Sequence, residues 1–211
     1  MRTDAEAREQ IIQIVSELFA MGQLTPTGGN VSARSADPDL IWITPSQMYK
    51  GGLSVDDLVC IREDGTAVAG GNKCSVEYQM HWGAYRAREE ATAAVHTHAP
   101  YVTAFGITNQ QFPPVNTDAV FLADTLIVPW FMPGSKDLAD AVGEALKVSR
   151  GAILQCHGLM AAGKTMRDAA TRAMMLEETA KLVLLCKQFG GDVTMIPNEW
   201  VERLAGFASF L

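Results

Sequence analysis

Long apolar runs are absent from this sequence: none reaches the roughly 18 residues that a membrane-spanning helix requires. The first ten residues, MRTDAEAREQ, are rich in charge and lack the basic-then-apolar order of a secretory signal. The four cysteines are widely spaced and form no CxxC pair, which argues against a zinc knuckle or a redox couple. We therefore expect a cytoplasmic protein without a membrane partner.

Positive charge is also scarce. Lys and Arg number 17 against 24 Asp and Glu, giving a formal net charge of -7, and the basic residues are scattered singly. A basic stripe is the usual electrostatic mark of a nucleic-acid-binding protein, so the sequence argues against that partner. With 48% hydrophobic residues among 211, the chain can bury a real core. A globular protein with a small-molecule partner is favoured.

Segments of helical and strand-like periodicity alternate along the chain. A helix is predicted over residues 5–21, followed by short strands and turns from about 25 to 71. The later predicted elements are a helix capped by Ser75 and ending near Arg88, strands at 91–98, 125–130 and 151–158, helices around 138–146 and 166–188, and a short C-terminal helix. No internal repeat or linker interrupts this order, which predicts a single α/β domain of three layers over residues 1–211.

Two of the four histidines, His96 and His98, are two residues apart in a predicted strand. Side chains alternate across a strand, so both imidazoles project from the same side and can share one metal ion. Zinc commonly takes three protein ligands and keeps a fourth position for water or substrate, so a third ligand is expected. His157, at the end of a predicted strand and directly before Gly158, is the candidate.

Other interpretations of the histidines remain open. A pair spaced like His96 and His98 is a weak signal alone, because isolated histidines also occur in cores and on surfaces. Three of four histidines at predicted strand ends make the joint interpretation stronger. His81, four residues after Glu77 on a predicted helix, offers a rival metal pair. We favour instead a His81 packed under the sheet with both nitrogens hydrogen-bonded.

Glu77 and three polar loops complete the candidate site. A carboxylate in the first turn of a helix can bind the cation or act as a general base, although a solvated glutamate is common there. The loops TPTGGNVSAR and ITPSQ and the helix start at Ser75 can converge on one phosphate or carboxylate. Each loop taken alone is more typical of an ordinary turn.

The motifs TGGNVSAR, ITPS, KCSVE, VHTHAP and QCHGL, in this order and spacing, resemble the class II aldolase/adducin family. The match extends from the first helix to the long helix after His157. The resemblance implies a three-layer α/β/α fold with a central, mostly antiparallel sheet. It also implies a homotetramer in which zinc lies between neighbouring subunits.

The resemblance assigns roles residue by residue. His96, His98 and His157 match the zinc ligands of the family, and Glu77 matches the carboxylate that moves the proton. The substrate and phosphate pocket of the aldolases corresponds to Gly29, Asn30, Ser46, Gln47 and Ser75.

This chain departs from the aldolase pattern in three places. Val76 stands where the aldolases have a second serine, and Gln47 stands where they have a glycine. The loop of the aldolase tyrosine reads FPPVNTDAVF, with Thr117 or Asp118 at the matching position. Asp118 can serve as an acid or base, although a loop aspartate without a role is equally expected.

The resemblance implies a divalent cation that stabilises the enediolate left when a carbon–carbon bond breaks. Our first hypothesis is a retro-aldol lyase acting on a small hydroxy-carbonyl compound or a ketose phosphate. The alternatives are a decarboxylase of a hydroxy-aromatic or β-keto acid, a sugar-phosphate 4-epimerase, and a non-catalytic adducin-like module. The last is disfavoured because such modules are expected to lack the intact histidine triad. Zinc is the expected cation, with manganese or cobalt as alternatives that accept the same ligands.

Overall fold

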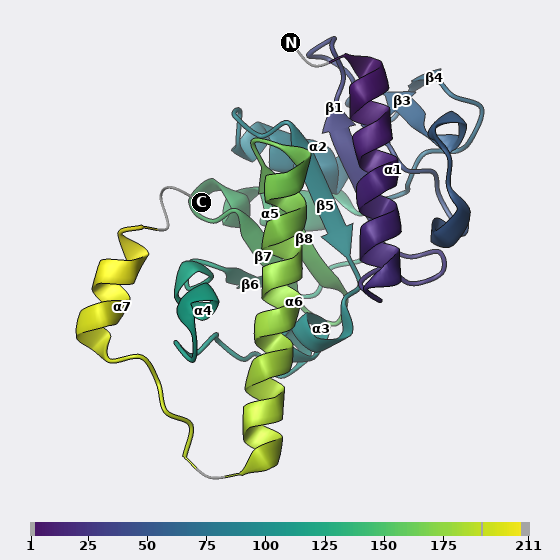
Figure 1. Ribbon diagram of the computed structural model, residues 1–211. Helices are drawn as coiled ribbons and strands as arrows, with labels where there is room; N and C mark the ends of the chain where they lie inside the picture. Colours follow the sequence, from purple (N-terminus) through teal and green to yellow (C-terminus); the bar gives the residue numbers. More distant parts are fainter. Residues whose placement is uncertain (1–2, 191, 208–211) are drawn as a thin grey trace.

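The computed structural model, which describes residues 3–190 and 192–207, is built around one eight-stranded sheet (Figure 1). The strands lie in the order β4-β3-β2-β1-β5-β8-β7-β6. Among the described residues, β6 and β7 form the one parallel pair, so the sheet is mostly antiparallel, as predicted. The strands are β1 (Asn30–Arg34), β2 (Ile41–Ile43), β3 (Val59–Ile61), β4 (Ala67–Ala69), β5 (Ala93–Thr97), β6 (Leu126–Val128), β7 (Gly151–Leu154) and β8 (Gly158–Gly163).

Helices cover both faces of this sheet (Figure 1). They are α1 (Asp4–Ala20), α2 (Tyr78–Ala87), α3 (Pro100–Ile107), α4 (Thr117–Phe121), α5 (Lys136–Val148), α6 (Met166–Phe189) and α7 (Asn198–Ala205), with two 3-10 turns at Lys50–Gly52 and Val55–Asp57. The helices α1, α3 and α6 pack on one face, and α2 and α5 pack on the other. The three layers predicted from the sequence are confirmed.

The sheet separates two hydrophobic cores. Side chains that alternate along its strands contribute to one core and the other in turn. On β5, Val95 is buried with the residues of α1 and α6, whereas its neighbour Ala94 is buried with those of α2 and α5. His96 follows in the same alternation and therefore lies on the α2 face. Burial of apolar side chains on both faces fixes the register of β5, because a slip by one residue would exchange the two sets.

Local signals at the long helices agree with this packing. Thr3 and Glu6 form a capping box at the start of α1, and Thr165 and Asp168 form another at the start of α6. Each box satisfies backbone N–H groups that have no partner inside the helix. Helices α1 and α6 therefore begin close to the positions predicted from the sequence.

The structure corrects several predicted elements. Helix α2 begins at Tyr78 with Glu77 at its N-cap position, so Ser75 is not the cap and Glu77 does not lie inside the first turn. Strand β7 ends at Leu154, and His157 lies in the turn that leads into β8 instead of in a strand. The strand β8 and the helices α3 and α4 were not predicted.

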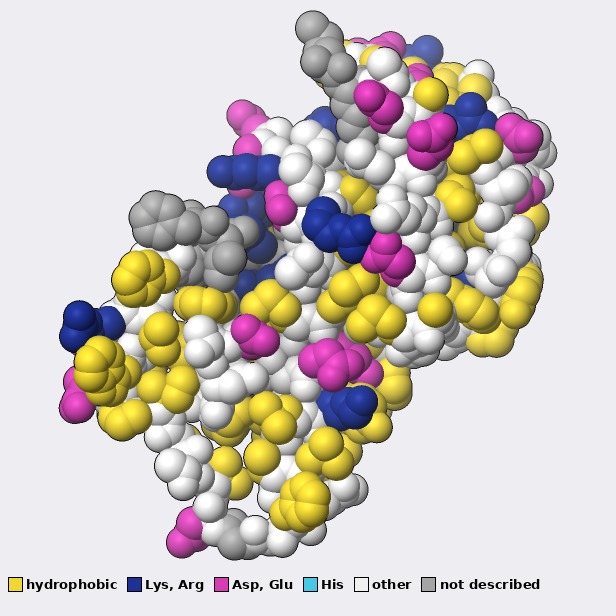
Figure 2. All heavy atoms as spheres, viewed as in Figure 1, with side chains coloured by type: hydrophobic (Ala, Val, Ile, Leu, Met, Phe, Trp, Pro, Cys, Tyr) yellow, Lys and Arg dark blue, Asp and Glu magenta, His cyan; other side chains and the backbone are white. Residues whose placement is uncertain are grey.

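The described residues include no helix long and apolar enough to cross a membrane. Figure 2 shows hydrophobic side chains on the surface around α7 and the C-terminal half of α6. Among them, Phe189 is 88% exposed and Trp200 is 48% exposed. Helix α7 buries none of its side chains, although the segment before it is tied to the body by a backbone hydrogen bond from Ile196 to Pro114.

Candidate metal centre

The imidazoles of His96 and His98 meet at the end of β5. His96 belongs to the strand and His98 follows it by two residues, so both rings project toward the same side. Their Nε2 atoms are 3.0 Å apart and their ring centroids 4.8 Å apart. His96 is completely buried, whereas His98 is partly exposed, which leaves the pair accessible from one side.

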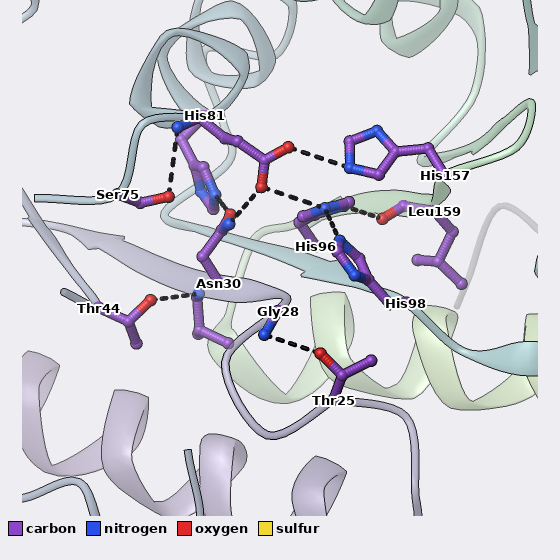
Figure 3. A network of polar contacts seen from close by, with 12 residues as sticks. Thr25, Gly28, Asn30, Thr44, Ser75, His81, His96, His98, His157 and Leu159 are labelled. Atoms are coloured by element: carbon purple, nitrogen blue, oxygen red, sulfur yellow. Dashed lines mark hydrogen bonds and ion pairs between the residues drawn. The ribbon is translucent and has the colours of Figure 1, made fainter. Parts of the chain in front are cut away.

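His157 joins this pair from the turn between β7 and β8. Its ring centroid lies 4.7 Å from that of His96 and 5.1 Å from that of His98, and Figure 3 shows the three rings turned toward one another. The turn can approach β5 this closely because residue 158 is glycine: a Cβ there would lie 2.0 Å from the carbonyl oxygen of Thr97. The third imidazole is thus placed by strand pairing and a close backbone contact.

Glu77 brings a carboxylate to the three imidazoles. Its Oε1 lies 3.0 Å from Nε2 of His157, and its Oε2 lies 3.4 Å from Nε2 of His96. The four groups each offer one ligand atom, and these atoms lie within 4.8 Å of one another. The cluster therefore combines three imidazole nitrogens and one carboxylate, a donor set suited to a divalent cation.

The hydrogen bonds around the cluster leave two atoms that could bind a metal directed at a common centre. The Nδ1 of His96 lies 2.7 Å from the carbonyl oxygen of Leu159, which can only accept, so the ring proton sits on Nδ1 and Nε2 presents its lone pair. The Oε1 of Glu77 is buried without a hydrogen bond, since its contact with His157 has the distance but not the geometry of one. A cation in the cluster would satisfy both atoms, so the residues fit a divalent metal.

Burial sets the charges in the cluster. It lowers the pKa of His96 to about 3 and also lowers the pKa of His98, so both rings are neutral near pH 7 and can act as ligands. For Glu77, burial by itself would raise the pKa. The neighbouring His96 and His157 and a hydrogen bond from Asn30 outweigh burial and hold the pKa below its ordinary value. Glu77 is therefore an ionised carboxylate in contact with the imidazoles.

The three polar loops of the sequence meet beside the cluster. Ser46 donates its backbone N–H to the carbonyl of Lys73, which brings the ITPSQ loop next to the segment containing Ser75. The Ser75 hydroxyl accepts from the backbone N–H of Glu77 at 3.2 Å. Two residues that depart from the aldolase pattern, Gln47 and Val76, are both exposed.

The glycine turn before β1 lies directly against the cluster. Gly29 has φ +81°, a conformation that favours glycine. A Cβ on Gly28 would lie 2.6 Å from Nδ1 of His98 and 2.5 Å from the Thr25 hydroxyl, which accepts from the N–H of Gly28. Asn30, the next residue but one, donates from Nδ2 to Oε2 of Glu77 at 2.7 Å. This turn therefore shapes one wall of the centre.

Asp118 and His81 both lie outside the cluster found among the described residues. Asp118 lies in the first turn of α4, is exposed, and does not belong to the His and Glu cluster found among the described residues. Its role as an acid or base stays a prediction. His81 has both ring nitrogens in hydrogen bonds, to Ser32 and Asn30, which confirms the packed histidine and not the rival metal pair.

Sequence reasoning missed two buried polar features near the centre. Lys50 is only 2% exposed, donates from Nζ to the Pro45 carbonyl at 3.1 Å, and has a pKa lowered by burial to about 8. Nothing in the sequence distinguishes it from a surface lysine. The second feature is a contact between the Ser32 and Tyr85 hydroxyls behind Glu77. The four-residue spacing of Glu77, His81 and Tyr85 could have indicated the position of Tyr85.

Known proteins that resemble this chain include aldolases and a decarboxylase. The 5-deoxy-D-ribulose 1-phosphate aldolase of Bacillus thuringiensis is 31% identical over 199 residues, covering 94% of this chain and 93% of that protein. The 3-oxo-tetronate 4-phosphate decarboxylase of Haemophilus influenzae is 30% identical over 186 residues, covering 85% and 88%. A solved structure of an L-fuculose 1-phosphate aldolase superposes with a TM-score of 0.87 at 25% identity, covering 100% of this chain and 99% of that one.

The family description that matches residues 9–184 is that of the class II aldolase and adducin N-terminal domain. This match covers most of the chain and includes the three imidazoles and the carboxylate of the cluster. The resemblance inferred from the motifs and the predicted fold class are both confirmed. The chain belongs to the class II aldolase and adducin family.

Proposed function

We propose that this aldolase-type lyase cleaves a carbon–carbon bond of a small hydroxy-carbonyl or ketose-phosphate substrate in a retro-aldol reaction that depends on a divalent cation. The observation that carries the proposal is the convergence of His96, His98 and His157 with Glu77 in a partly exposed cluster. Zinc is the cation we propose, because three imidazole nitrogens are typical zinc ligands. Manganese and cobalt accept the same ligands.

The residues of the centre divide the chemistry among them. When bound, the cation would supply a Lewis acid that polarises a substrate carbonyl. Glu77 is ionised and lies against two of the three imidazoles, so it can accept a proton from substrate and return it to the carbon skeleton. Burial of Glu77 at 7% exposure keeps bulk water from competing for that proton.

The polar loops are the proposed binding site for the rest of the substrate. Gly29, Asn30, Ser46, Gln47 and Ser75 are the proposed substrate and phosphate contacts. The adjacency of the Ser46 and Ser75 loops supports this assignment. Asn30 makes its hydrogen bonds to Glu77 and His81, so its contribution to a phosphate is indirect. With Val76 in place of a hydroxyl, we expect phosphate to add less than about tenfold to kcat/KM.

Decarboxylation is the second candidate. The decarboxylase of Haemophilus influenzae covers most of this chain, and the same polarised carbonyl would help a substrate to lose carbon dioxide. Asp118, on α4, stays our proposed further acid or base, a group that decarboxylation does not need because no hydroxyl proton has to leave. A 4-epimerase would need the same base, and a non-catalytic adducin-like module would not need the cluster.

One experiment separates these candidates. Metal-loaded protein is incubated with ketose phosphates, the same free ketoses, β-keto acids and hydroxy-aromatic acids, and aldehyde and carbon dioxide are measured separately. Metal-dependent aldehyde release would support the retro-aldol proposal. Carbon dioxide without aldehyde would overturn it in favour of the decarboxylase, and no turnover of any substrate together with no bound metal would overturn both.

We also propose that the protein is a cytoplasmic homotetramer with its centres at subunit interfaces. The support in this chain is the apolar surface of α6, α7 and the segments beside α7, where six large side chains are at least 37% exposed. They are Leu184, Leu185, Phe189, Met195, Trp200 and Phe207. An exposed apolar area of this kind is typical of an interaction surface.

A further inference from the structure

A line of buried polar side chains runs behind Glu77, between α2 and β1. Glu77 at the N-cap of α2 and His81 and Tyr85 within the helix are spaced at four-residue intervals. His81 and Tyr85 therefore share the helix face that begins at Glu77. Asn30 and Ser32 are two apart on β1 and face that helix. All of them except Glu77 are at most 4% exposed, and Figure 3 shows His81 beside Asn30.

Four contacts connect these side chains into one hydrogen-bond network. The Tyr85 hydroxyl lies 2.7 Å from the Ser32 hydroxyl, which lies 2.7 Å from Nδ1 of His81. The Nε2 of His81 contacts Oδ1 of Asn30. Finally, Nδ2 of Asn30 donates to Oε2 of Glu77 at 2.7 Å. This hydrogen-bond network therefore ends at the Glu77 carboxylate of the metal centre.

The chemistry of each group fixes the direction of every hydrogen bond. An ionised carboxylate only accepts, so Asn30 turns its NH₂ toward Glu77 and its carbonyl toward His81. His81 must then carry its proton on Nε2. Burial lowers the pKa of His81 to about 4, so the neutral ring has a lone pair on Nδ1 and accepts from Ser32. Ser32, having given its proton, accepts from Tyr85.

We propose that His81 is a positioning residue that holds the Asn30 amide in the orientation Glu77 needs for proton transfer. The proposal rests on the proposed function of Glu77. Without the N–H of His81, the Asn30 amide is free to turn over and to present its carbonyl to the carboxylate. Glu77 would then lose its hydrogen bond at Oε2 and its fixed position beside His96.

This role differs from metal binding and from simple packing. Both nitrogens of His81 are occupied by Ser32 and Asn30, and His81 does not belong to the metal cluster found among the described residues. Loss of a packing residue would lower stability without a specific effect on turnover. Loss of a positioning residue should lower kcat while metal content and KM stay close to those of the unchanged protein.

Variants of His81 test the proposal directly. His81→Met keeps much of the volume but has no N–H, and we expect it to lower kcat at least about 30-fold with KM within about threefold. His81→Gln keeps an N–H that can reach Asn30 and should recover kcat to within about fivefold of the unchanged protein. Metal content and melting temperature are measured for every variant. A kcat within about twofold of normal for folded, metal-loaded His81→Met would overturn the proposal.

Two tyrosines on α2 provide a matched control. Tyr85→Phe removes the first donor of the hydrogen-bond network, whereas Tyr78→Phe removes a hydroxyl that donates to the Asp64 carbonyl on a different side of α2. We expect a loss of kcat from the first change and none from the second. Equal losses from both would mean that activity responds to any change on α2, and the proposal would be wrong.

A spectroscopic measurement separates this proposal from the proposed function. Nitrogen-15 spectra of the histidine side chains in the metal-loaded protein should show His81 in the Nε2–H tautomer, assigned by comparison with His81→Gln. An Nδ1–H tautomer would overturn the hydrogen-bond network whatever the activity. If Glu77→Gln leaves turnover intact, the proposed function of Glu77 fails even when the expected tautomer is found.

Discussion

The three imidazoles of the centre differ in their surroundings, and this determines what their removal does. His96 is fixed by the Leu159 carbonyl and completely buried, whereas His98 is partly exposed and bordered by Gly28. A substitution at His98 is therefore less expected to disturb the fold than one at His96. Its effect reports on the metal and not on packing.

We predict that His98→Ala binds metal more weakly, so that most of it is lost on dialysis, and falls below a hundredth of normal activity, because the cation would lose one of its three imidazole ligands. Metal content is measured by atomic spectroscopy after dialysis against a weak chelator. Cys156→Ser is the control, because Cys156 is exposed and precedes His157 without belonging to the cluster. Full metal content in His98→Ala would contradict the assignment of this ligand.

Glu77 belongs to the same cluster as His98, but we expect it to carry a proton and not to be essential for metal binding. We predict that Glu77→Gln retains metal through the three imidazoles while kcat falls about 10²–10⁴-fold, the usual contribution of a positioned general base. The amide cannot accept a proton, although its size is unchanged. Steady-state kinetics on metal-loaded protein measures the effect. If kcat stays normal, the proton carrier lies elsewhere.

At the scale of secondary structure, α3 depends on a carboxylate from another helix. Glu177 of α6 is 5% exposed and accepts from the backbone N–H groups of Tyr101 at 3.1 Å and Val102 at 2.8 Å. Helix α3 begins at Pro100 and has no side-chain cap of its own. The carboxylate satisfies N–H groups of the first turn that would otherwise be buried without a partner.

We predict that Glu177→Ala lowers the free energy of unfolding by about 2–3 kcal/mol, because it leaves buried N–H groups without an acceptor. Glu177→Gln keeps one acceptor oxygen and should cost less. Urea denaturation followed by circular dichroism measures both, with Glu178→Ala as the control on the exposed face of α6. A loss in Glu177→Ala no greater than that of the control would show that α3 does not depend on this contact.

At the scale of the whole molecule, the surface of α6 and α7 bears on assembly. We predict a particle mass close to four times the 22.8 kDa of one chain, measured by light scattering or analytical ultracentrifugation. Replacing Phe189, which is 88% exposed, with Glu should shift this mass downward because a charge would have to be buried in the interface. A monomer in the unchanged protein would refute the homotetramer proposal.

The elements that sequence analysis missed share a physical cause. Strand β8 has the sequence GLMAAG, whose glycines and alanines have low strand propensity, and pairing with β5 and β7 on both sides makes it a strand. Pro100 follows the strand predicted at 91–98, and a proline at this place also suits the first turn of a helix such as α3. In both cases tertiary contacts decided what local propensity left open.

The sequence by itself determined the layers, the family and the identity of the four clustered residues, because side-chain periodicity and motif order are local properties of the chain. Only the tertiary structure decided that His157 reaches β5 from a turn, that Glu77 sits at a helix N-cap, and that Asp118 stays outside the cluster. These facts depend on strand pairing and close backbone contacts between distant segments, such as Gly158 against Thr97. No spacing along the chain encodes such contacts, because they exist only once the sheet has formed.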